Sequence, residues 1–354
     1  MNESKPQRYL ALDAMRGFLM LVLVSGGLGM GALIKTPKYH WIAAQFHHLD
    51  WEGLIVWELI MPSFMFMVGT SLPFALSRRT GKGATFPDNF RHVAYRTLRL
   101  ILLGQFLTTY RAGHYQHEPY ETLTQLGASY FCCFLVLSLR PRWQVVAASV
   151  LMAINWGLYV LFPGSAGPFS PQDNIGAVID RAVWGLNPGG DWASMNFLGS
   201  SVTVLFGAWA GQLFLSKKTH ALKQKILLTA AAGCFAAGTI LLPVNPIIHK
   251  AWTASFTLLH TGCVLLAVTV FYLMFDVKGY RKPAFPLVVV GMNSIFIYML
   301  SQLLRGWFDK VVASLTYRFQ FLGEAGPAVQ ACAVTLAMWY VCYWLYKRGI
   351  FFKV

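Results

Sequence analysis

The sequence predicts an all-α membrane protein that crosses the bilayer about ten times, with both termini in the cytoplasm. Of its 354 residues 56% are hydrophobic and 12% are charged, whereas a soluble domain carries about 25% charged residues. One spanning helix needs about 20 apolar residues, so the chain can hold roughly ten spans joined by short loops. A separate soluble domain of ordinary size does not fit, and residues 1–354 are predicted to form a single transmembrane domain.

Ten apolar runs are predicted to be spanning helices, because an open sheet cannot satisfy its backbone hydrogen bonds in lipid. The fourth run is the least apolar, since Thr124, Gln125 and Ser129 dilute it. The segment 306–326 could hide a short re-entrant piece. The expected spans are 12–33, 53–76, 92–110, 122–139, 143–163, 194–215, 224–243, 252–275, 285–305 and 327–346.

The distribution of Lys and Arg predicts the orientation of these spans. With the N-terminus inside, 21 of the 29 Lys and Arg residues fall in cytoplasmic segments and 8 fall outside. This is the positive-inside bias of membrane proteins. The outer segments are then the longer and more polar ones, and the segment rich in Gly and Pro is expected to be an irregular loop. They are 34–52, 111–121, 164–193, 244–251 and 306–326.

Several protein classes are excluded by the same patterns. The net charge of +15 does not indicate nucleic-acid binding, because the cations recur in small groups between apolar runs rather than on one basic face. The six cysteines all lie in apolar runs without C-x-x-C spacing, so neither a disulfide framework nor a metal site is expected. No cleavable signal peptide is expected either, because charges interrupt the N-terminal approach and no small-residue cleavage site follows.

The densest polar cluster of the outer segments is the run FHHLDWEG at 46–53. His48 lies there at the predicted membrane edge, close in sequence to Asp50 and Glu52. A histidine can take or give a proton near neutral pH, which makes His48 a candidate general base. A solvated loop histidine with aromatic interfacial neighbours would show the same pattern.

Glu58 is the one acidic residue of the sequence that falls well inside a predicted span. It lies about five residues from the outer end, which is roughly 8 Å deep at the rise of a helix. Carboxylates in membranes are costly and usually face a bundle interior or a polar cavity. Glu58 is therefore a candidate partner of His48, with a structural polar contact as the alternative.

Other polar residues in the apolar runs have a structural and a functional interpretation. Asp13 and Arg16 are neighbours on one helix face, so they form either an anchoring ion pair or a polar floor for a cofactor. Asn293 and Ser294 fall in mid-span, where an amide needs a helix or a ligand as its partner. His260 is interpreted as a packing residue. The glycine-rich run 26–31 is interpreted as a bend or a close helix contact, not as a phosphate loop.

The chain also resembles a known family in several motifs that keep their order. The run RYLALDAMRG at 8–17 resembles the family pattern R-x-x-S-x-D-x-x-R-G. The residues His48-x-x-Trp51-x-Gly53 and the run ELIMPSFMFMVG at 58–69 resemble H-x-x-W-x-G followed by D-L-x-F-P-x-F-x-F-x-x-G. The segments 243–252, 276–279 and 291–295 resemble later motifs. The family is that of the heparan-α-glucosaminide N-acetyltransferases.

This resemblance implies a multi-pass enzyme of the cell's inner membrane that transfers an acetyl group across the bilayer. Acetyl-CoA would be supplied from the cytoplasm, and the acceptor would be an amino sugar or related glycan on the far side. The family's catalytic histidine corresponds to His48. Its aspartate in the second span is Glu58 here, and its asparagine at the outer end of the first span is Ser25.

Within this enzyme hypothesis His48 acts as general base or, alternatively, as an acetylated nucleophile. Glu58 orients it or balances its charge, and Asn293 or Ser294 donates to the developing oxyanion. Basic inner-face residues could hold the CoA phosphates, although positive-inside loops supply such residues anyway. The expected cofactor contacts are Asp13, Arg16, Arg78, Arg79, Arg96 and Arg99, and the expected substrate contacts are Ser25, Trp51 and Trp252.

A transporter of an amino sugar or related saccharide is the alternative hypothesis. The absence of a convincing internal repeat counts against it, because many transporters are built from inverted halves. Membrane lipid and a saccharide acceptor are the expected partners, and a homodimer is left open.

Overall fold

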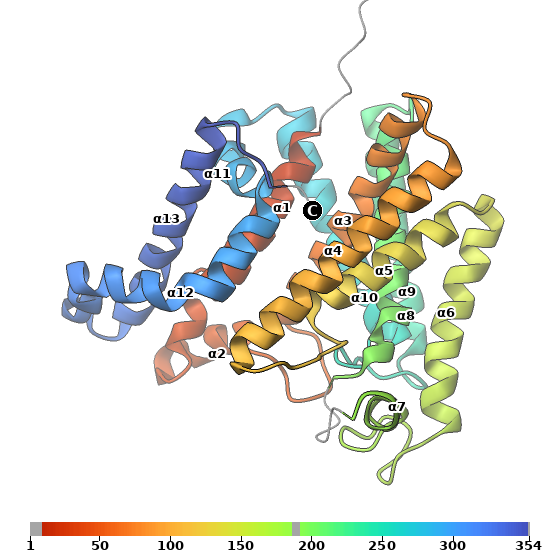
Figure 1. Cartoon of the computed structure of the whole chain (residues 1–354), viewed down its shortest axis with the longest axis horizontal. Helices are drawn as coiled ribbons and strands as arrows, with labels where there is room; N and C mark the ends of the chain where they lie inside the picture. The colour runs from red at the N-terminus through yellow and green to blue at the C-terminus, as the bar shows by residue number, and fades with distance from the viewer. Residues whose placement is uncertain (1–8, 186–191, 353–354) are drawn as a thin grey trace, which may run out of the picture. The chain divides into compact units, whose positions relative to one another are not determined.

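The computed structural model describes residues 9–185 and 192–352, and the regular secondary structure of this part of the chain is helical (Figure 1). Within these ranges the only β-type pairings are two isolated bridges, Glu52 with Ile248 and Gly164 with Gly167. The α-helices are α1 Leu10–Ser25, α2 His40–Ala43, α3 Val56–Thr80, α4 Phe86–Ala112, α5 Thr122–Leu137, α6 Pro141–Leu161, α7 Ile175–Trp184, α8 Phe197–Leu215, α9 His220–Leu241, α10 Ala254–Tyr272, α11 Arg281–Gly291, α12 Ser294–Thr316 and α13 Gly326–Lys347.

Shorter helical pieces complete the chain. A π-helix, η5 Leu273–Val277, extends α10. The 3-10 helices are η1 Met30–Leu33, η2 Pro37–Tyr39, η3 Ala44–Phe46, η4 Ser194–Asn196 and η6 Tyr317–Ala325.

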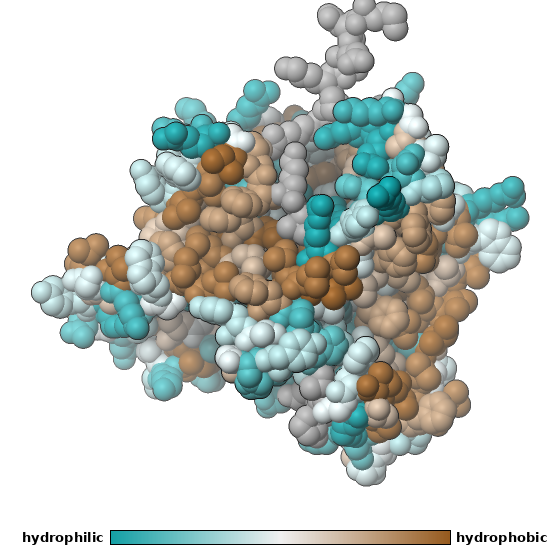
Figure 2. Space-filling model, viewed as in Figure 1, coloured by the Kyte–Doolittle hydropathy of each residue, from teal (hydrophilic) through white to brown (hydrophobic). Residues whose placement is uncertain are grey.

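The protein is a polytopic helical membrane protein. Seven helical stretches of the described residues are long and apolar enough to cross a bilayer, and one of them, Ser294–Lys347, is 54 residues long. Helix α6 turns Val145, Val150 and Leu161 outward, where a soluble protein would place polar residues. Figure 2 shows such apolar side chains on the surface over α6 and over α12. A surface of this kind is suited to lipid rather than water.

Contacts along the chain divide it into two compact units. Unit 1 comprises Met1–His48, Ile55–Ile60 and Leu266–Val354, and unit 2 comprises Leu49–Leu54 and Met61–Leu265. The divisions fall within α3 and within α10. The expectation of one functional domain over 1–354 stays a prediction.

Helix α1 is the centre of unit 1 and packs most extensively on α11. A side chain at Gly17 would collide with the backbone carbonyl of Leu287, and one at Gly291 would collide with that of Asp13. Small residues at such positions let two helix backbones approach closely, which is a common packing mode in membranes. The start of α1 is held by Asp276 of η5, whose carboxylate accepts the amides of Leu10 (2.8 Å) and its neighbour. This carboxylate satisfies N–H groups that every helix leaves open at its N-terminus.

Two predicted spans of unit 1 are interrupted in the structure. The first helix ends at Ser25 rather than continuing to residue 33, and the glycine-rich turn follows, with Gly26, Gly27 and Gly29 at positive φ. This confirms the predicted bend. The expected span 285–305 breaks after Gly291, and α12 then continues to Thr316. The segment 306–326, which was expected outside, therefore begins as a helix, and its side of the membrane stays a prediction.

Unit 2 explains why the fourth predicted span is diluted by polar residues. Helix α5 packs against α4 and α8. Ser129 of α5 lies 2.6 Å from the hydroxyl of Ser200 on α8, and the amide of Gln125 donates to the same hydroxyl at 3.2 Å. These polar side chains face a neighbouring helix, where each finds a partner, rather than lipid.

The outer segment 164–193, which was expected to be an irregular loop, contains the helix α7. Asn174 begins this helix, because its side chain accepts the backbone amide of Ala177 at 3.0 Å. Gly185 ends it in the left-handed conformation. This ten-residue helix was not predicted, because the segments on either side of it are rich in Pro and Gly. It nevertheless has its own capping residues at both ends.

Candidate active site

His48 and Glu58 lie in hydrogen-bonding contact in unit 1. The ring Nδ1 of His48 is 3.2 Å from Oε1 of Glu58. The two side chains differ sharply in environment, since that of His48 is 53% exposed and that of Glu58 is 3% exposed. A buried carboxylate therefore holds an imidazole that faces outward, which is the arrangement of an oriented general base.

Trp57 decides which tautomer of His48 is present. Its indole N–H donates to Nε2 of His48 at 3.1 Å. An indole nitrogen can only donate, so Nε2 of the neutral ring carries a lone pair and Nδ1 carries the proton toward Glu58. If His48 acts as a base through Nε2, the acceptor substrate has to replace the indole N–H of Trp57 as the hydrogen-bond partner of this atom. Hydrogen bonds of this kind often rearrange when the substrate binds.

Glu58 lies in the first turn of α3, which begins at Val56. This is closer to the helix start than the five residues expected from the predicted span. The carboxylate is nevertheless buried. A negative charge at this position is stabilised by the positive end of the helix dipole and by the imidazole.

The loop before His48 is folded against the outer end of α1. His47 contacts the carbonyl oxygen of Gly31 through Nε2 (2.9 Å), and His40 contacts that of Ile34 through Nδ1 (3.0 Å). Gly29, at a φ of 84°, packs against the backbone of Ala328 on α13. These contacts fix the backbone of the segment that precedes His48.

Asp13 and Arg16 form the expected ion pair on α1. Asp13 is buried and Arg16 is partly buried. The pair therefore lies in the packed part of unit 1, near the α1–α11 contact. A role in cofactor binding stays a prediction.

Unit 2 contains the basic candidates Arg78, Arg79, Arg96 and Arg99. Arg79 at the end of α3 donates through Nε to the side chain of Asn89 (2.9 Å) and so holds the start of α4. Arg96 donates to the hydroxyl of Tyr130 at 3.2 Å and stacks over its ring. The charges of Arg79, Arg96 and Arg99 all act on His92, so three guanidinium groups gather around one turn of α4. Arg78 is exposed.

The three expected substrate contacts have different environments. Ser25 is buried at the end of α1, where its hydroxyl accepts the amide of Leu28 at 2.7 Å and shapes the glycine turn. Trp51 is partly buried and donates to the carbonyl of Phe169 at 2.9 Å. Trp252 is 0% exposed, and its indole N–H donates to Thr203 at 3.1 Å. The buried environments of Ser25 and Trp252 are those of residues that hold the fold.

His260 belongs to the same buried network as Trp252. Its Nε2 lies 3.2 Å from the hydroxyl of Thr203, and its Nδ1 lies 2.8 Å from the carbonyl oxygen of Phe256. Nδ1 therefore donates to the carbonyl, and Nε2 accepts from the threonine. Both ring nitrogens have partners, which confirms the interpretation of His260 as a packing residue.

Asn293 and Ser294 lie at the break between α11 and α12. The amide of Asn293 donates to the carbonyl of Ile350 (3.1 Å) and its oxygen accepts the amide of Phe352 (3.0 Å), which ties the C-terminal segment to the α11–α12 break. Ser294, partly buried, is the first residue of α12. Both follow Gly291, which packs against the start of α1, whereas His48 follows the loop beyond the end of α1. The geometry thus gives Asn293 a structural role.

Trp57 is the site residue that sequence reasoning missed. Its only signal is its position directly before Glu58 in the predicted span. Tryptophan is common at membrane edges, so its position there does not indicate a functional role.

Comparisons with known proteins agree with these motifs. The family model described as heparan-alpha-glucosaminide N-acetyltransferase, catalytic, matches residues 8–165 of the chain. The chain resembles the heparan-alpha-glucosaminide N-acetyltransferases. The human enzyme of this name is 24% identical over 422 aligned residues, which cover 99% of this chain and 60% of the human protein. The mouse enzyme is 24% identical over 427 residues, which cover 100% of this chain and 61% of the mouse protein.

The chain thus spans about three fifths of the length of these curated relatives. The matched range 8–165 includes the Asp13–Arg16 pair, the His48–Glu58 pair and the arginines of α4. The family resemblance and the clustering of titratable residues therefore fall on the same part of the sequence.

Proposed function

We propose that this protein is an acetyl-CoA-dependent transmembrane acyltransferase that acetylates an amino sugar or related glycan on the extracytoplasmic face. The observation that carries the proposal is the His48–Glu58 pair, an exposed imidazole oriented by a buried carboxylate. The similarity of almost the whole chain to enzymes named for N-acetyl transfer to a glucosaminide supports the reaction class.

The topology proposed for this function has ten spans and cytoplasmic termini, in the inner membrane. Each of the ten predicted ranges contains an α-helix, including α4 and α5, which are not among the seven clear candidates. The positive-inside bias supports the orientation. In this orientation His48 faces the acceptor side, and the arginines of α3 and α4 face the cytoplasm. We propose that residues 1–354 act as one catalytic domain, and a homodimer is a further proposal.

His48 acts on the acceptor in this mechanism. Nε2 removes the proton from the acceptor amine or hydroxyl as the new bond to the acetyl carbon forms. The resulting imidazolium keeps its Nδ1–H directed to Glu58, whose buried carboxylate stabilises the positive charge. Trp57 holds the ring until the acceptor replaces it at Nε2.

Acetyl-CoA is the donor substrate and supplies the acetyl group as a reactive thioester. The N–C or O–C bond forms as the C–S bond breaks, and the thiolate leaves with the proton that His48 returns. The guanidinium groups of Arg79, Arg96 and Arg99, with Arg78 nearby in sequence, suit the phosphates of CoA because charged hydrogen bonds to phosphate are strong. The Asp13–Arg16 pair is proposed as a polar floor for the donor.

The acceptor is expected to contact residues on the outer side of the protein. Trp51 is partly buried and carries an apolar ring of the type that packs on sugars, so it is the preferred contact. Ser25 and Trp252 would act through the loops that they hold. Asn293 or Ser294 is proposed as the donor to the developing oxyanion.

The proposal is tested with purified protein in detergent, labelled acetyl-CoA and a panel of amino sugars. Acetylated sugar, formed in amounts that depend on both substrates, is the expected result. Counterflow of the sugar in proteoliposomes without CoA, together with no acetylated product, would instead indicate a transporter.

A further inference from the structure

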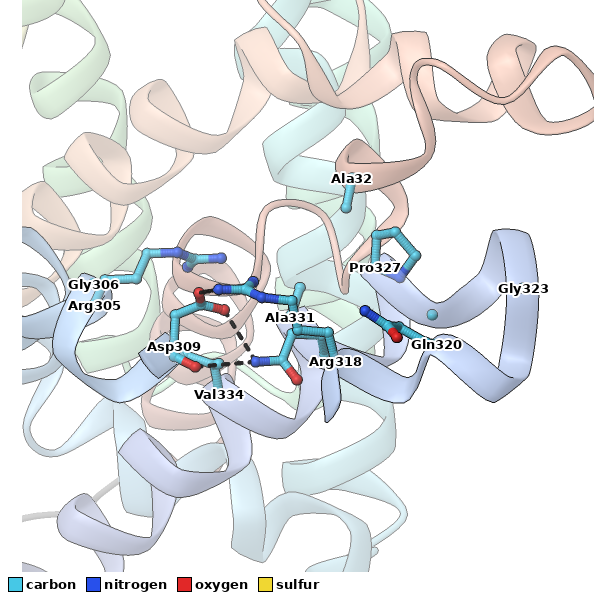
Figure 3. A pocket seen from close by; sticks show the side chains of 12 residues that line it. Ala32, Arg305, Gly306, Asp309, Arg318, Gln320, Gly323, Pro327, Ala331 and Val334 are labelled. Atoms are coloured by element: carbon cyan, nitrogen blue, oxygen red, sulfur yellow. Dashed lines mark hydrogen bonds and ion pairs between the residues drawn. The ribbon is translucent and has the colours of Figure 1, made fainter. Parts of the chain in front are cut away.

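A cavity of about 620 Å³ lies in unit 1 among α12, η6 and α13, away from His48 in the sequence (Figure 3). Its lining combines charged and amide side chains with small apolar residues. The lining residues are Ala32, Arg305, Gly306, Asp309, Arg318, Gln320, Gly323, Gly326, Pro327, Gln330, Ala331 and Val334.

The acidic and amide groups that line the cavity already form hydrogen bonds and an ion pair with neighbouring side chains. Asp309 accepts from Arg318 at 2.9 Å and from the amide of Gln330 at 3.0 Å. The oxygen of Gln330 accepts from the hydroxyl of Thr316 at 3.0 Å. Two guanidinium groups, those of Arg305 and Arg318, stand against this single carboxylate. The lining therefore carries a net charge of +1 (two Arg minus one Asp) and suits a ligand that is negative and accepts hydrogen bonds.

The backbone that presents Arg318 is strained. Tyr317, Arg318 and Phe319 have φ values of 48°, 55° and 52° in succession. Outside glycine this conformation is disfavoured, because Cβ comes too close to the backbone. Strain of this kind persists where the surrounding structure enforces it, and it clusters at ligand sites. Here it directs the guanidinium of Arg318 to Asp309, as Figure 3 shows.

The rim of the cavity has the composition of a membrane interface. Tyr317 and Phe321 are each 80% exposed, and Trp307 and Leu315 of α12 are also exposed. Aromatic side chains gather at the level of the lipid headgroups, and apolar ones gather below it. Arginine side chains at this level can bind the phosphate of an anionic headgroup through charge-assisted hydrogen bonds.

We propose that this cavity binds the phosphate of an anionic lipid, with Arg305 and Arg318 as the phosphate ligands. The small apolar residues Pro327, Ala331 and Val334 would contact the lipid's apolar part. A free sugar is the poorer occupant, because it is neutral and gains nothing from the net positive charge of the lining. The proposal does not depend on acyl transfer.

The test is a titration of the full-length protein in neutral detergent, with lipid binding followed by native mass spectrometry. Phosphatidylglycerol is expected to bind at least tenfold more tightly than phosphatidylcholine with the same acyl chains. Arg318→Gln and Arg305→Gln are each expected to weaken phosphatidylglycerol about tenfold, the usual effect of losing one charge-assisted bond. Lys310→Gln, which removes an exposed neighbouring charge that does not line the cavity, is the control and should have no effect.

A second variant keeps the proposal testable if the arginine variants fold poorly. Asp309→Asn removes the competing carboxylate and should leave phosphatidylglycerol binding unchanged or tighter, whereas a cation site would lose its ligand. Weaker binding in Asp309→Asn, or equal losses in Arg318→Gln and Lys310→Gln, would overturn the proposal. Inorganic phosphate is the third arm. If it competes with the lipid at equal concentration, the site is one for free phosphate and the lipid assignment fails.

Discussion

At the scale of single residues, the proposed chemistry depends on three residues that contact one another. Glu58 is buried and fixed in the first turn of α3, Trp57 holds Nε2, and His48 presents the exposed ring. In the proposed mechanism His48 is the residue that exchanges a proton with the substrate, because imidazole is the side chain suited to this role. The other two residues position it.

Replacement of His48 by alanine is expected to lower kcat by about 10²–10⁴-fold, the usual contribution of a general base. The adjacent His47 offers a matched control, because it is also an exposed loop imidazole and contacts only the backbone carbonyl of Gly31 among the described bonds. His47→Ala should keep most of the activity. Steady-state kinetics of the two variants with labelled acetyl-CoA make the comparison. Equal losses in both would show that the loop matters and the His48 imidazole does not.

Glu58 is expected to tolerate Asp better than Gln. The aspartate keeps the charge that stabilises the imidazolium, and it is the residue that the resemblance implies for this position. Glu58→Gln should lower kcat by about 10–100-fold with little change in KM for the acceptor, since a lost charge-assisted bond is worth about 1.5–3 kcal/mol. Thermal unfolding of both variants serves as the folding control. Equal activity of Glu58→Gln and the unaltered protein would remove Glu58 from the mechanism.

The same scale shows what the sequence could and could not predict about the site. His48 and Glu58 were identifiable because a histidine at a membrane edge and an acid in an apolar run are both unusual. The burial of Trp252 and the amide bonds of Asn293 depend on contacts with residues about 50 positions away in the chain. No local pattern encodes such contacts, so the sequence could not predict them, and the substrate and oxyanion roles of these residues stay predictions.

At the scale of elements, the contact of α1 with α11 relies on glycine. Gly17→Ala should destabilise the protein by about 1–3 kcal/mol, because the new methyl group meets the rigid backbone at Leu287. Gly157→Ala on α6 is the control, since nothing lies within 4 Å of a Cβ at that position. The midpoint of thermal unfolding in detergent should fall for the first variant only. Unchanged midpoints for both would mean that the two helices are not in close contact.

The loop before α7 contains a carboxyl group with a depressed pKa. Hydrogen bonds from Ser165 and Ser170 lower the pKa of Asp173 from 3.8 to about 2. Because the folded pKa lies below the unfolded one, the stabilisation is complete above about pH 4 and is lost as the pH falls through 2. Asp173→Asn should mimic this loss at pH 7 and speed proteolysis within 164–174. Asp50→Asn, in another exposed loop, should not, and equal cleavage rates in the two variants would contradict the role of Asp173.

Element boundaries were predictable where local chemistry sets them. The turn after Ser25 follows from its glycines, which alone adopt positive φ without cost. The break before α12 was not predictable. Met292 and Asn293 interrupt an otherwise apolar run, and no Gly-Pro pair marks the position. That break is held by the C-terminal segment through Asn293, a contact that forms only in the folded chain.

At the scale of the whole molecule, hydropathy and charge carry most of the predictable information. Every predicted span coincides with at least one helix, because the requirement to bury backbone polar groups in lipid allows little else. The division into two units was not visible, because it depends on contacts between segments far apart in the sequence. The proposed function depends on which residues face each side of the membrane. The central claim is therefore that the donor and the acceptor reach the protein from opposite sides.

Sealed, right-side-out membrane vesicles test that claim most directly. Labelled acetyl-CoA is loaded inside, and a membrane-impermeant amino sugar is supplied only outside. Acetylated sugar should appear outside with the unaltered protein and with His47→Ala, and it should fall to background with His48→Ala. Product formed only when donor and acceptor share one side, or formed equally by His48→Ala, would contradict a transfer across the membrane through His48.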